Sequence, residues 1–251
     1  MTISITGGQW YEMQNILAQS PADVFLSWQC RQYIAKDRWR KNPKNLEVHK
    51  DTSPGVMPGT VAHNSTEVAT DTFGSARRSQ RLLNPLSALD PVYSCANELQ
   101  VLSVGPRTEM ELFHLMAIGF RPENIKALDL ISSSPMIDTG DMHAMPYPDR
   151  TFDVVISSWV LNYSSTPQVA VDEMLRVCKT NALLAIGVTY APNRGTGTAI
   201  TDPGATKIIG SMQRMAQDLA DMLKDHIAET HFTASQAVDK QGPVMLIVRV
   251  K

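Results

Sequence analysis

The residues best suited to chemistry in this sequence are one glycine and two acids that follow short apolar runs. Gly105 ends the run Val101–Val104 and precedes Pro106–Glu109, which predicts a strand, a tight turn and the start of a helix. Such a turn lets the backbone approach a charged ligand, to which the helix N-terminus offers free N–H groups. Asp129 follows Gly105 by 24 residues (129 − 105), and Asp141 follows by another 12. A carboxylate ending the second strand binds ribose hydroxyls, so this spacing predicts a site for a cofactor that contains adenosine.

These residues lie in a part of the chain, from Glu98 onward, where short apolar runs alternate with helical patterns. That alternation predicts βαβ units around a parallel sheet. We expect strands at residues 100–105, 125–130, 136–139, 152–159 and 182–188, helices at 108–118, 167–178 and 205–224, and a closing pair of strands at 226–232 and 244–250. The predicted fold class is α/β, with a doubly wound, Rossmann-like sheet.

Residues 1–95 predict a helical and loop-rich cap, and residues 96–251 predict the core. Helices are expected in the cap at residues 10–18, 20–40 and 75–89. Residues 42–72 hold several prolines and glycines and no apolar period, which predicts a long irregular loop. A loop of that length is usually a lid, a binding loop or a disordered segment. The basic residues from Arg31 to Lys41 predict a solvated helix end, with anion binding as the alternative.

Composition limits the classes of function. The 251 residues (27.7 kDa) are 43% hydrophobic and 19% charged, which suits a globular protein with a full core. A net charge of -2 and a pI near 6.3 argue against nucleic-acid and membrane partners, because both favour a basic face. The three cysteines have no paired spacing, and no stretch resembles a membrane span or a secretory signal. We expect a cytoplasmic monomer or homodimer without a metal site.

Two further blocks carry a resemblance to a known family. The segment from Gly140 to Ser158, GDMHAMPYPDRTFDVVISS, and the segment from Glu173 to Lys179, EMLRVCK, resemble blocks of class I S-adenosylmethionine-dependent methyltransferases of the small-molecule type, close to methyltransferase type 11. Val160–Tyr163 is similar to the helix between these blocks. The resemblance covers roughly residues 100–188, and the rest matches only in general layout. It implies a seven-stranded methyltransferase sheet and S-adenosylmethionine as the cofactor.

The resemblance also implies roles for individual residues. The turn would meet the methionine end of the cofactor, Asp129 the ribose, and Asp141 the adenine amine. His143 would cover the adenine or be an exposed turn residue, and Asp129 has the alternative of being only a cap or turn residue. The residues implied in cofactor binding are Gly105, Pro106, Arg107, Thr108, Glu109, Asp129, Leu130, Asp141, Met142, His143, Ser157 and Ser158.

The turn departs from the family pattern at three positions. Ser103 stands where the family usually has an acid, and Arg107 and Glu109 stand where it has further glycines. We expect Arg107 to pair with the methionine carboxylate, which its planar guanidinium matches, and Glu109 or Glu111 to face the amino group. The alternative is a degenerate turn in which an Arg107–Glu111 pair only braces the start of the helix.

The segment between Asp129 and Asp141 is also unusual. Residues 131–140 are too few for the helix that normally joins the second and third strands. One side of the adenine pocket must therefore be open or covered by another segment, and the N-terminal region is the candidate. A second shortening, at Thr180–Asn181, replaces the Pro-Gly-Gly turn of the family and leaves the site untouched.

The sequence predicts a methyltransferase that acts on a small molecule, by in-line transfer in a site covered by a lid. In-line displacement needs donor and acceptor aligned at about 3 Å without water, and a general base is optional. The candidate catalytic residues are Asn162, Tyr163 and Tyr190, and the candidate substrate contacts are Trp10, Tyr11 and Arg194; each also suits simple packing. Two alternatives stay open, a cyclase or lyase that releases methylthioadenosine and a non-catalytic module that binds the cofactor.

Overall fold

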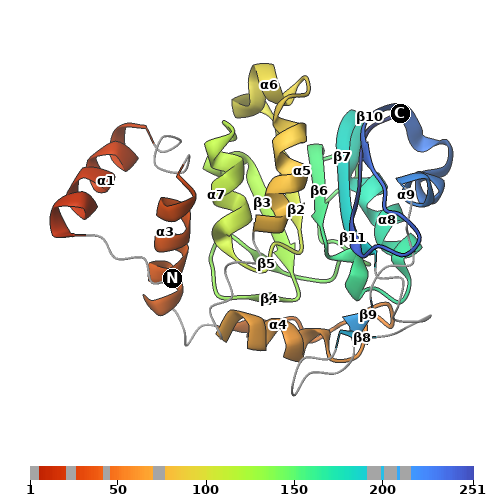
Figure 1. Ribbon diagram of the computed structural model, residues 1–251, viewed down its shortest axis with the longest axis horizontal. Helices are drawn as coiled ribbons and strands as arrows, with labels where there is room; N and C mark the ends of the chain where they lie inside the picture. The colour runs from red at the N-terminus through yellow and green to blue at the C-terminus, as the bar shows by residue number, and fades with distance from the viewer. Residues whose placement is uncertain are drawn as a thin grey trace.

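A mixed sheet of seven strands forms the centre of the molecule, in the order β10–β11–β7–β6–β2–β3–β5 (Figure 1). The computed structural model describes residues 6–20, 27–41, 46–69, 77–190, 199–200, 208–209 and 216–251. The strands are β2 (Val101–Val104), β3 (Ile125–Asp129), β5 (Asp138–Thr139), β6 (Phe152–Ser158), β7 (Cys178–Tyr190), β10 (Ile227–Ala234) and β11 (Gly242–Val250). All run parallel except β11. The predicted doubly wound α/β fold, with its closing pair of strands, is confirmed.

Helices cover both faces of this sheet. α5 (Arg77–Ser87) and α7 (Glu109–Ala117) lie on one face, and α8 (Pro167–Val177) and α9 (Ala216–Leu223) lie on the other. Each face has its own apolar core, and the fully buried strand β2 contributes to both. A strand covered on both faces carries a continuous apolar run, which is why such runs located the central strands in the sequence.

The helix after the glycine turn begins where the sequence predicts. Thr108 is the N-cap of α7, and its hydroxyl accepts a hydrogen bond from the Met110 N–H. The two acids of the first turn, Glu109 and Glu111, oppose the positive end of the helix dipole. After Ala117 the chain turns at Gly119, which has a φ of 109°.

The order of the strands creates a switch point between β2 and β6. From β2 the chain builds β3 and β5 on one side, and then it returns to build β6 and β7 on the other side. The connections at the carboxyl ends of β2 and β6 therefore leave the sheet in opposite directions, and α/β proteins bind ligands at such points. Gly105 follows β2 there, and Ser157 and Ser158 end β6.

The chain passes from β3 to β5 without a helix, as the spacing of Asp129 and Asp141 predicts. It forms instead the short strand β4 (Ile131–Ser132), which pairs antiparallel with β1 (Glu47–Val48). Residues 46–59, which contain β1, are called the strap below. The strap thus pairs with the segment that replaces the usual helix.

The N-terminal region also contains α1 (Gly7–Gln19), α3 (Trp28–Lys41) and α4 (Thr60–Ala69). The prediction of an irregular loop at residues 42–72 is wrong for α4. Residues 60–69 contain neither glycine nor proline, so nothing interrupts a helix, but their polar composition concealed its buried side. Figure 1 shows α4 lying across one end of the sheet, below the ends of its strands and next to β4.

The helix α5 belongs to the layers of the sheet although the predicted cap reaches residue 95. Its leucines Leu82, Leu83 and Leu86 are fully buried, and the helix contacts β6, β7 and α7. A division of the chain at residue 95 would separate α5 from the core that it builds.

The predicted helix at residues 205–224 is wrong at its start. Ile208–Ile209 form the strand β9, which pairs with β8 (Ala199–Ile200), and α9 begins only at Ala216. Two adjacent β-branched residues favour a strand over a helix. Within the predicted range, residues 210–215 lie outside the described residues, whereas Leu219 is buried in the core.

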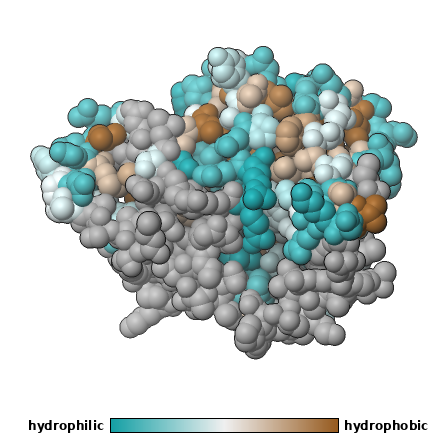
Figure 2. Space-filling model, viewed as in Figure 1, coloured by the Kyte–Doolittle hydropathy of each residue, from teal (hydrophilic) through white to brown (hydrophobic). Residues whose placement is uncertain are grey.

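Polar and hydrophobic residues are mixed on the surface over α5 and α7 (Figure 2). Figure 2 shows hydrophobic residues scattered among polar ones on the described part of this face. Scattered apolar residues are normal on a soluble surface. Among the described helices, none is both long and apolar enough to cross a membrane.

Candidate active site

The turn after β2 is held in a strained backbone conformation. Gly105 has a φ of 72°, and a Cβ at this position would collide with Val160. Arg107 has a φ of 58°, a left-handed conformation that side chains other than glycine rarely adopt. The Arg107 N–H donates a hydrogen bond of 2.8 Å to Oδ2 of Asp129. The turn therefore binds to the second strand of the site through its own backbone.

Asp129 lies buried beside this turn. Its Oδ1 accepts a hydrogen bond of 3.3 Å from the Ile131 N–H, in addition to the bond from Arg107. Burial raises the pKa of Asp129 above its ordinary value, and the Arg107 guanidinium and three backbone N–H groups oppose that rise. A carboxylate has about four acceptor positions, so Asp129 retains capacity for ligand hydroxyls. Its neighbour Leu130 uses its carbonyl to accept from the His49 N–H of the strap, at 2.8 Å.

The side chain of Arg107 meets residues from two distant segments. Its guanidinium donates to the hydroxyl of Tyr163 at 3.2 Å, and that hydroxyl lies 3.3 Å from Nε2 of His63. The rings of His63 and Tyr163 also stack, with centroids 5.7 Å apart. Arg107 and Tyr163 were sequence candidates, but His63 was not, because α4 was taken for a loop. This cluster brings a cation, a phenol and an imidazole together at the switch point.

The two acids at the start of α7 have different partners. Glu109 accepts from Nε of Arg38 in α3 and from the hydroxyl of Ser134. Glu111 accepts from the hydroxyl of Ser103 at 2.7 Å. Glu109, which was expected to bind the cofactor, thus joins α3 to the segment that follows β4. Of the two acids proposed to face an amino group, Glu111 is the one without an arginine partner in the described structure.

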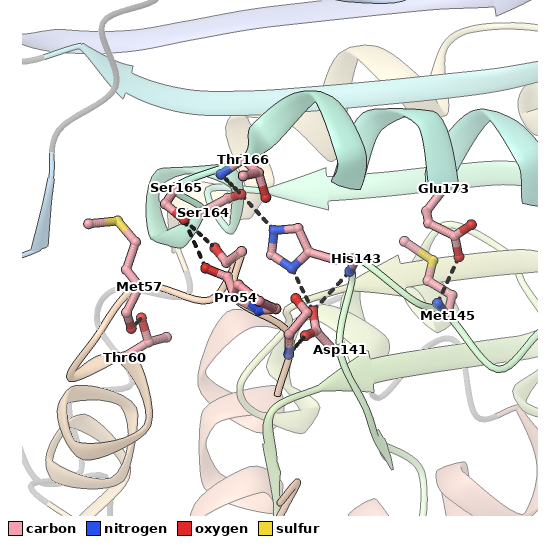
Figure 3. Close-up of polar contacts among 12 residues, drawn as sticks. Pro54, Met57, Thr60, Asp141, His143, Met145, Ser164, Ser165, Thr166 and Glu173 are labelled. Carbon is pink, nitrogen blue, oxygen red and sulfur yellow. Dashed lines mark hydrogen bonds and ion pairs between the residues drawn. The ribbon is translucent and has the colours of Figure 1, made fainter. Parts of the chain in front are cut away.

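The second acid of the site, Asp141, belongs to a network drawn in Figure 3. Its Oδ1 accepts from the His143 N–H at 2.9 Å and contacts Nδ1 of the same histidine at 2.6 Å. Its Oδ2 accepts from the Ser53 N–H at 2.7 Å. Nε2 of His143 lies 2.7 Å from the hydroxyl of Ser164. Burial raises the pKa of Asp141, but the hydrogen bonds from His143 and Ser53 outweigh burial and lower it.

The strap docks on the site beside this network. Gly55 packs so closely on His143 that an added Cβ would lie 2.7 Å from the ring. The Gly55 carbonyl accepts from Ser165 N–H at 2.9 Å, and the Met57 N–H donates to the Tyr163 carbonyl at 3.1 Å. His143 is therefore neither an exposed turn residue nor open to a ligand ring on the side that Gly55 covers.

Two serine hydroxyls at the end of β6 carry no hydrogen bond in the described structure. The Oγ atoms of Ser157 and Ser158 are both buried and have no partner. Ser157 is paired in register with Val104, one residue before Gly105. A buried polar group without a partner costs about 1–3 kcal/mol, and a ligand that supplies a partner removes this cost. Their position next to the turn is the one expected from the sequence.

Several of the other candidates have contacts within the chain that explain their positions without a ligand. The amide of Asn162 exchanges hydrogen bonds with the backbone of Thr189, and the hydroxyl of Tyr190 donates to the Val238 carbonyl at 2.9 Å. Met142 packs in the core under α8. Among the residues expected to contact the substrate, Trp10 packs on Tyr33 in α3, Tyr11 is 66% exposed, and Arg194 lies outside the described residues.

The central part of the chain is similar to a known protein family. Residues 106–186 match the family model described as a methyltransferase domain. The match begins at Pro106, directly after Gly105, and ends in β7, so it contains Arg107, Asp129, Asp141 and both serines. A search of curated proteins finds no match.

Three solved structures illustrate the similarity in fold. A SAM-dependent methyltransferase from Aquifex aeolicus is 19% identical, with 67% of this chain and 92% of that chain covered and a TM-score of 0.43. A 1,6-didemethyltoxoflavin-N1-methyltransferase from Burkholderia thailandensis is 13% identical, with 79% and 92% covered and a TM-score of 0.47. The cyclase SpnF is 15% identical, with 87% and 95% covered and a TM-score of 0.49.

Proposed function

We propose that the central part of this chain is a class I S-adenosylmethionine-dependent methyltransferase domain that methylates a small-molecule acceptor at the switch point between β2 and β6. The observation that carries the proposal is the cluster of Arg107, Tyr163 and His63 beside the cofactor residues of the domain. The phenol of Tyr163 and the imidazole of His63 at that position suit an acceptor with a polar, ionisable atom.

The residues present fit the cofactor at its methionine and ribose parts. The two unpartnered hydroxyls of Ser157 and Ser158 adjoin the turn, and Asp129 retains acceptor positions for ribose hydroxyls. Arg107 would bind the cofactor's carboxylate, since its planar guanidinium matches the geometry of a carboxylate. The adenine part is more restricted. Oδ1 of Asp141 already has two donors, whereas Oδ2 has one and can accept a second from an adenine amine.

The chemistry of the bound cofactor is donation of a methyl group from its sulfonium in an in-line displacement. The protein contributes alignment and the exclusion of water. Nε2 of His63 can take up the acceptor's proton, either directly or through the Tyr163 hydroxyl, whose oxygen lies 3.3 Å away. The strap and α4 supply the cover, because they contact the segments that carry these residues.

A small-molecule acceptor follows from this cover. Backbone hydrogen bonds hold the strap on Leu130, Tyr163 and Ser165, which supports a site that is covered on that side. The net charge of -2 does not favour a polyanionic acceptor such as a nucleic acid.

Product analysis tests this proposal. The purified protein is incubated with S-adenosylmethionine alone and with pools of small molecules that carry phenol, amine, thiol or carboxylate groups, and the products are separated by chromatography. We expect S-adenosylhomocysteine to form only when a pool contains the acceptor, with one methyl group added to it. Methylthioadenosine formed without an acceptor would instead establish cyclase or lyase chemistry. Tight binding of the cofactor without any product from a broad set of pools would favour a non-catalytic module.

A further inference from the structure

The carboxyl group of Glu111 lies beneath the turn that would hold the methionine end of the cofactor. Glu111 is in the first turn of α7 and is 4% exposed. Its Oε1 accepts from the hydroxyl of Ser103, which lies in β2 two residues before Gly105. An acid that the sequence lacks at Ser103 is thus supplied at nearly the same place by the neighbouring helix.

No cation neutralises this acid within the described structure. The charge of Asp129 from β3 acts on Glu111, and Glu109 and His114 are titratable groups on the same helix. From α3, Arg38 pairs with Glu109, and Arg31 acts on His114. Burial raises the pKa of Glu111 to about 7, and the nearby hydroxyls of Ser103 and Ser158 oppose that rise. A buried carboxyl group without a cation is costly to ionise, so the protein maintains this acid at a cost.

The polar groups around Glu111 come from the two strands that form the switch point, with Ser103 in β2 and Ser158 at the end of β6. Ser158 ends β6 and lies close enough to Glu111 to influence its charge, yet its hydroxyl makes no hydrogen bond of normal geometry. A purely structural role would need only the bond between Ser103 and residue 111, which an uncharged glutamine also makes. The buried acid and the unused hydroxyl both indicate a partner that is absent from the chain itself.

We propose that Glu111, together with the hydroxyls of Ser103 and Ser158, receives the ammonium group of the cofactor's methionine portion and releases a proton when it does so. This inference rests on the proposed function. The step is balanced: a neutral carboxyl group and an ammonium ion give an ion pair, and the proton passes to solvent. Glu111 thus supplies from the helix the acid that the family usually has at the position of Ser103.

Calorimetry with two ligands tests the inference. S-adenosylhomocysteine carries the amino group, and its deaminated analogue lacks only that group; each is titrated in buffers of different ionisation enthalpy. For the wild-type protein we expect S-adenosylhomocysteine to release about half a proton at pH 7, since the pKa is about 7. The release falls between pH 7 and pH 8.5, and the deaminated analogue causes none.

The variant Glu111→Gln keeps the bond to Ser103 and removes the charge. We expect it to bind S-adenosylhomocysteine about 10- to 100-fold more weakly, the range for a charge-assisted hydrogen bond of about 1.5–3 kcal/mol, and to release no proton. Its affinity for the deaminated analogue stays unchanged. Glu109→Gln is the matched control, because Glu109 lies on the same helical turn but bonds to Arg38 and Ser134; it keeps the proton release. The exchange Ser103→Asp with Glu111→Ser restores part of the affinity.

Two results would overturn these statements separately. If Glu111→Gln binds both ligands as tightly as the wild type and releases the same proton, the inference about Glu111 is wrong while the proposed function stands. If the wild type binds neither ligand, the proposed function fails, and the inference fails with it. Melting curves of each variant check that the fold is retained in every titration.

Discussion

Arg107 has two opposite effects at one position. Its φ of 58° costs the folded protein roughly 1 kcal/mol, whereas its side chain connects the turn to Tyr163. Strain that persists beside a ligand site is commonly retained for function. We therefore expect Arg107→Gly to leave the free energy of unfolding unchanged or raise it by about 1 kcal/mol, and to weaken S-adenosylhomocysteine binding at least tenfold.

Denaturant unfolding and calorimetry measure the two effects of this substitution. Asn181→Gly is the matched control, because Asn181 has a φ of 66° and is exposed in β7, outside the site. It should change stability in the same direction and leave the affinity untouched. A loss of affinity in both variants, or in neither, contradicts a ligand role for the Arg107 side chain.

Tyr163 and Tyr190 offer a second matched comparison. Tyr163→Phe removes the hydroxyl that joins Arg107 and His63, whereas Tyr190→Phe removes one that donates to the Val238 carbonyl. We expect Tyr163→Phe to lower methyl transfer at least tenfold with cofactor affinity nearly retained. Tyr190→Phe should cost about 1 kcal/mol of stability and little turnover. The measurement is the rate of S-adenosylhomocysteine formation in the presence of the acceptor. Equal losses of turnover in the two variants would contradict a special role of Tyr163 in methyl transfer.

The buried Glu111 makes stability depend on pH. Its pKa is about 7 in the folded state against an ordinary 4.5, so between these values the folded protein holds a proton that the unfolded chain releases. Stability from this group is therefore complete below pH 4.5 and is lost as pH rises through 7, by about 3 kcal/mol at most. We expect Glu111→Gln to flatten the decline in unfolding free energy between pH 5 and 8. A parallel decline in the variant would exclude Glu111 as its origin.

At the residue scale, the positions of polar groups could be predicted better than their partners. Asp129 and the serines of β6 lie where the apolar runs ended, because a parallel strand fixes which residues reach its carboxyl end. The partner of Glu109 could not be predicted, since Arg38 lies 71 residues away in the chain. Only packing of α3 on α7 brings these two side chains together.

The docking of the strap depends on the absence of a side chain at Gly55. Gly55→Ala would place a methyl group 2.7 Å from the His143 ring, so either the ring or the strap must move. Overpacking of this kind costs about 1–3 kcal/mol, and displacement of the strap weakens the Ser53 bond to Asp141. We expect Gly55→Ala to lower the melting temperature and to increase protease cleavage within residues 46–59.

A control for this substitution is available in α1. A Cβ added at Gly7 meets nothing within 4 Å, so Gly7→Ala should leave stability unchanged or raise it by up to about 1 kcal/mol. Protease cleavage of the strap should stay as in the wild type. Equal cleavage in Gly55→Ala and Gly7→Ala would mean that Gly55 does not control the strap.

Elements differ in how well their sequence reveals them. The absence of a helix between β3 and β5 could be predicted, since chain length alone excludes one. The helix α4 could not, because its buried residues Thr60, His63 and Asn64 are polar and give no apolar period. Among these side chains, His63 contacts Tyr163, which lies 100 residues away in the chain. Such a contact leaves no signal in the local sequence.

On the scale of the whole molecule, the cofactor site joins parts of the chain that are distant in sequence. α3 is tied to the start of α7 by Arg38 and Glu109, and the strap is tied to Asp141 by the Ser53 N–H. A ligand that contacts Asp129, Asp141 and the turn at once stabilises all of these contacts together. Binding is therefore expected to raise the local stability of the N-terminal segments that contact the site.

Hydrogen exchange of the strap with and without S-adenosylhomocysteine tests this coupling. Oδ2 of Asp141 has one donor, from Ser53, and retains an acceptor position, so the adenine amine can bind without displacing the strap. We expect slower exchange at residues 46–59 when the ligand is bound, and unchanged exchange at the β10–β11 pair. Faster exchange of the strap would mean that the adenine takes the place of the Ser53 N–H. In that case the strap has to leave Asp141 before the cofactor can bind, and the Gly55→Ala variant, whose strap is already displaced, would bind the ligand more tightly than the wild type.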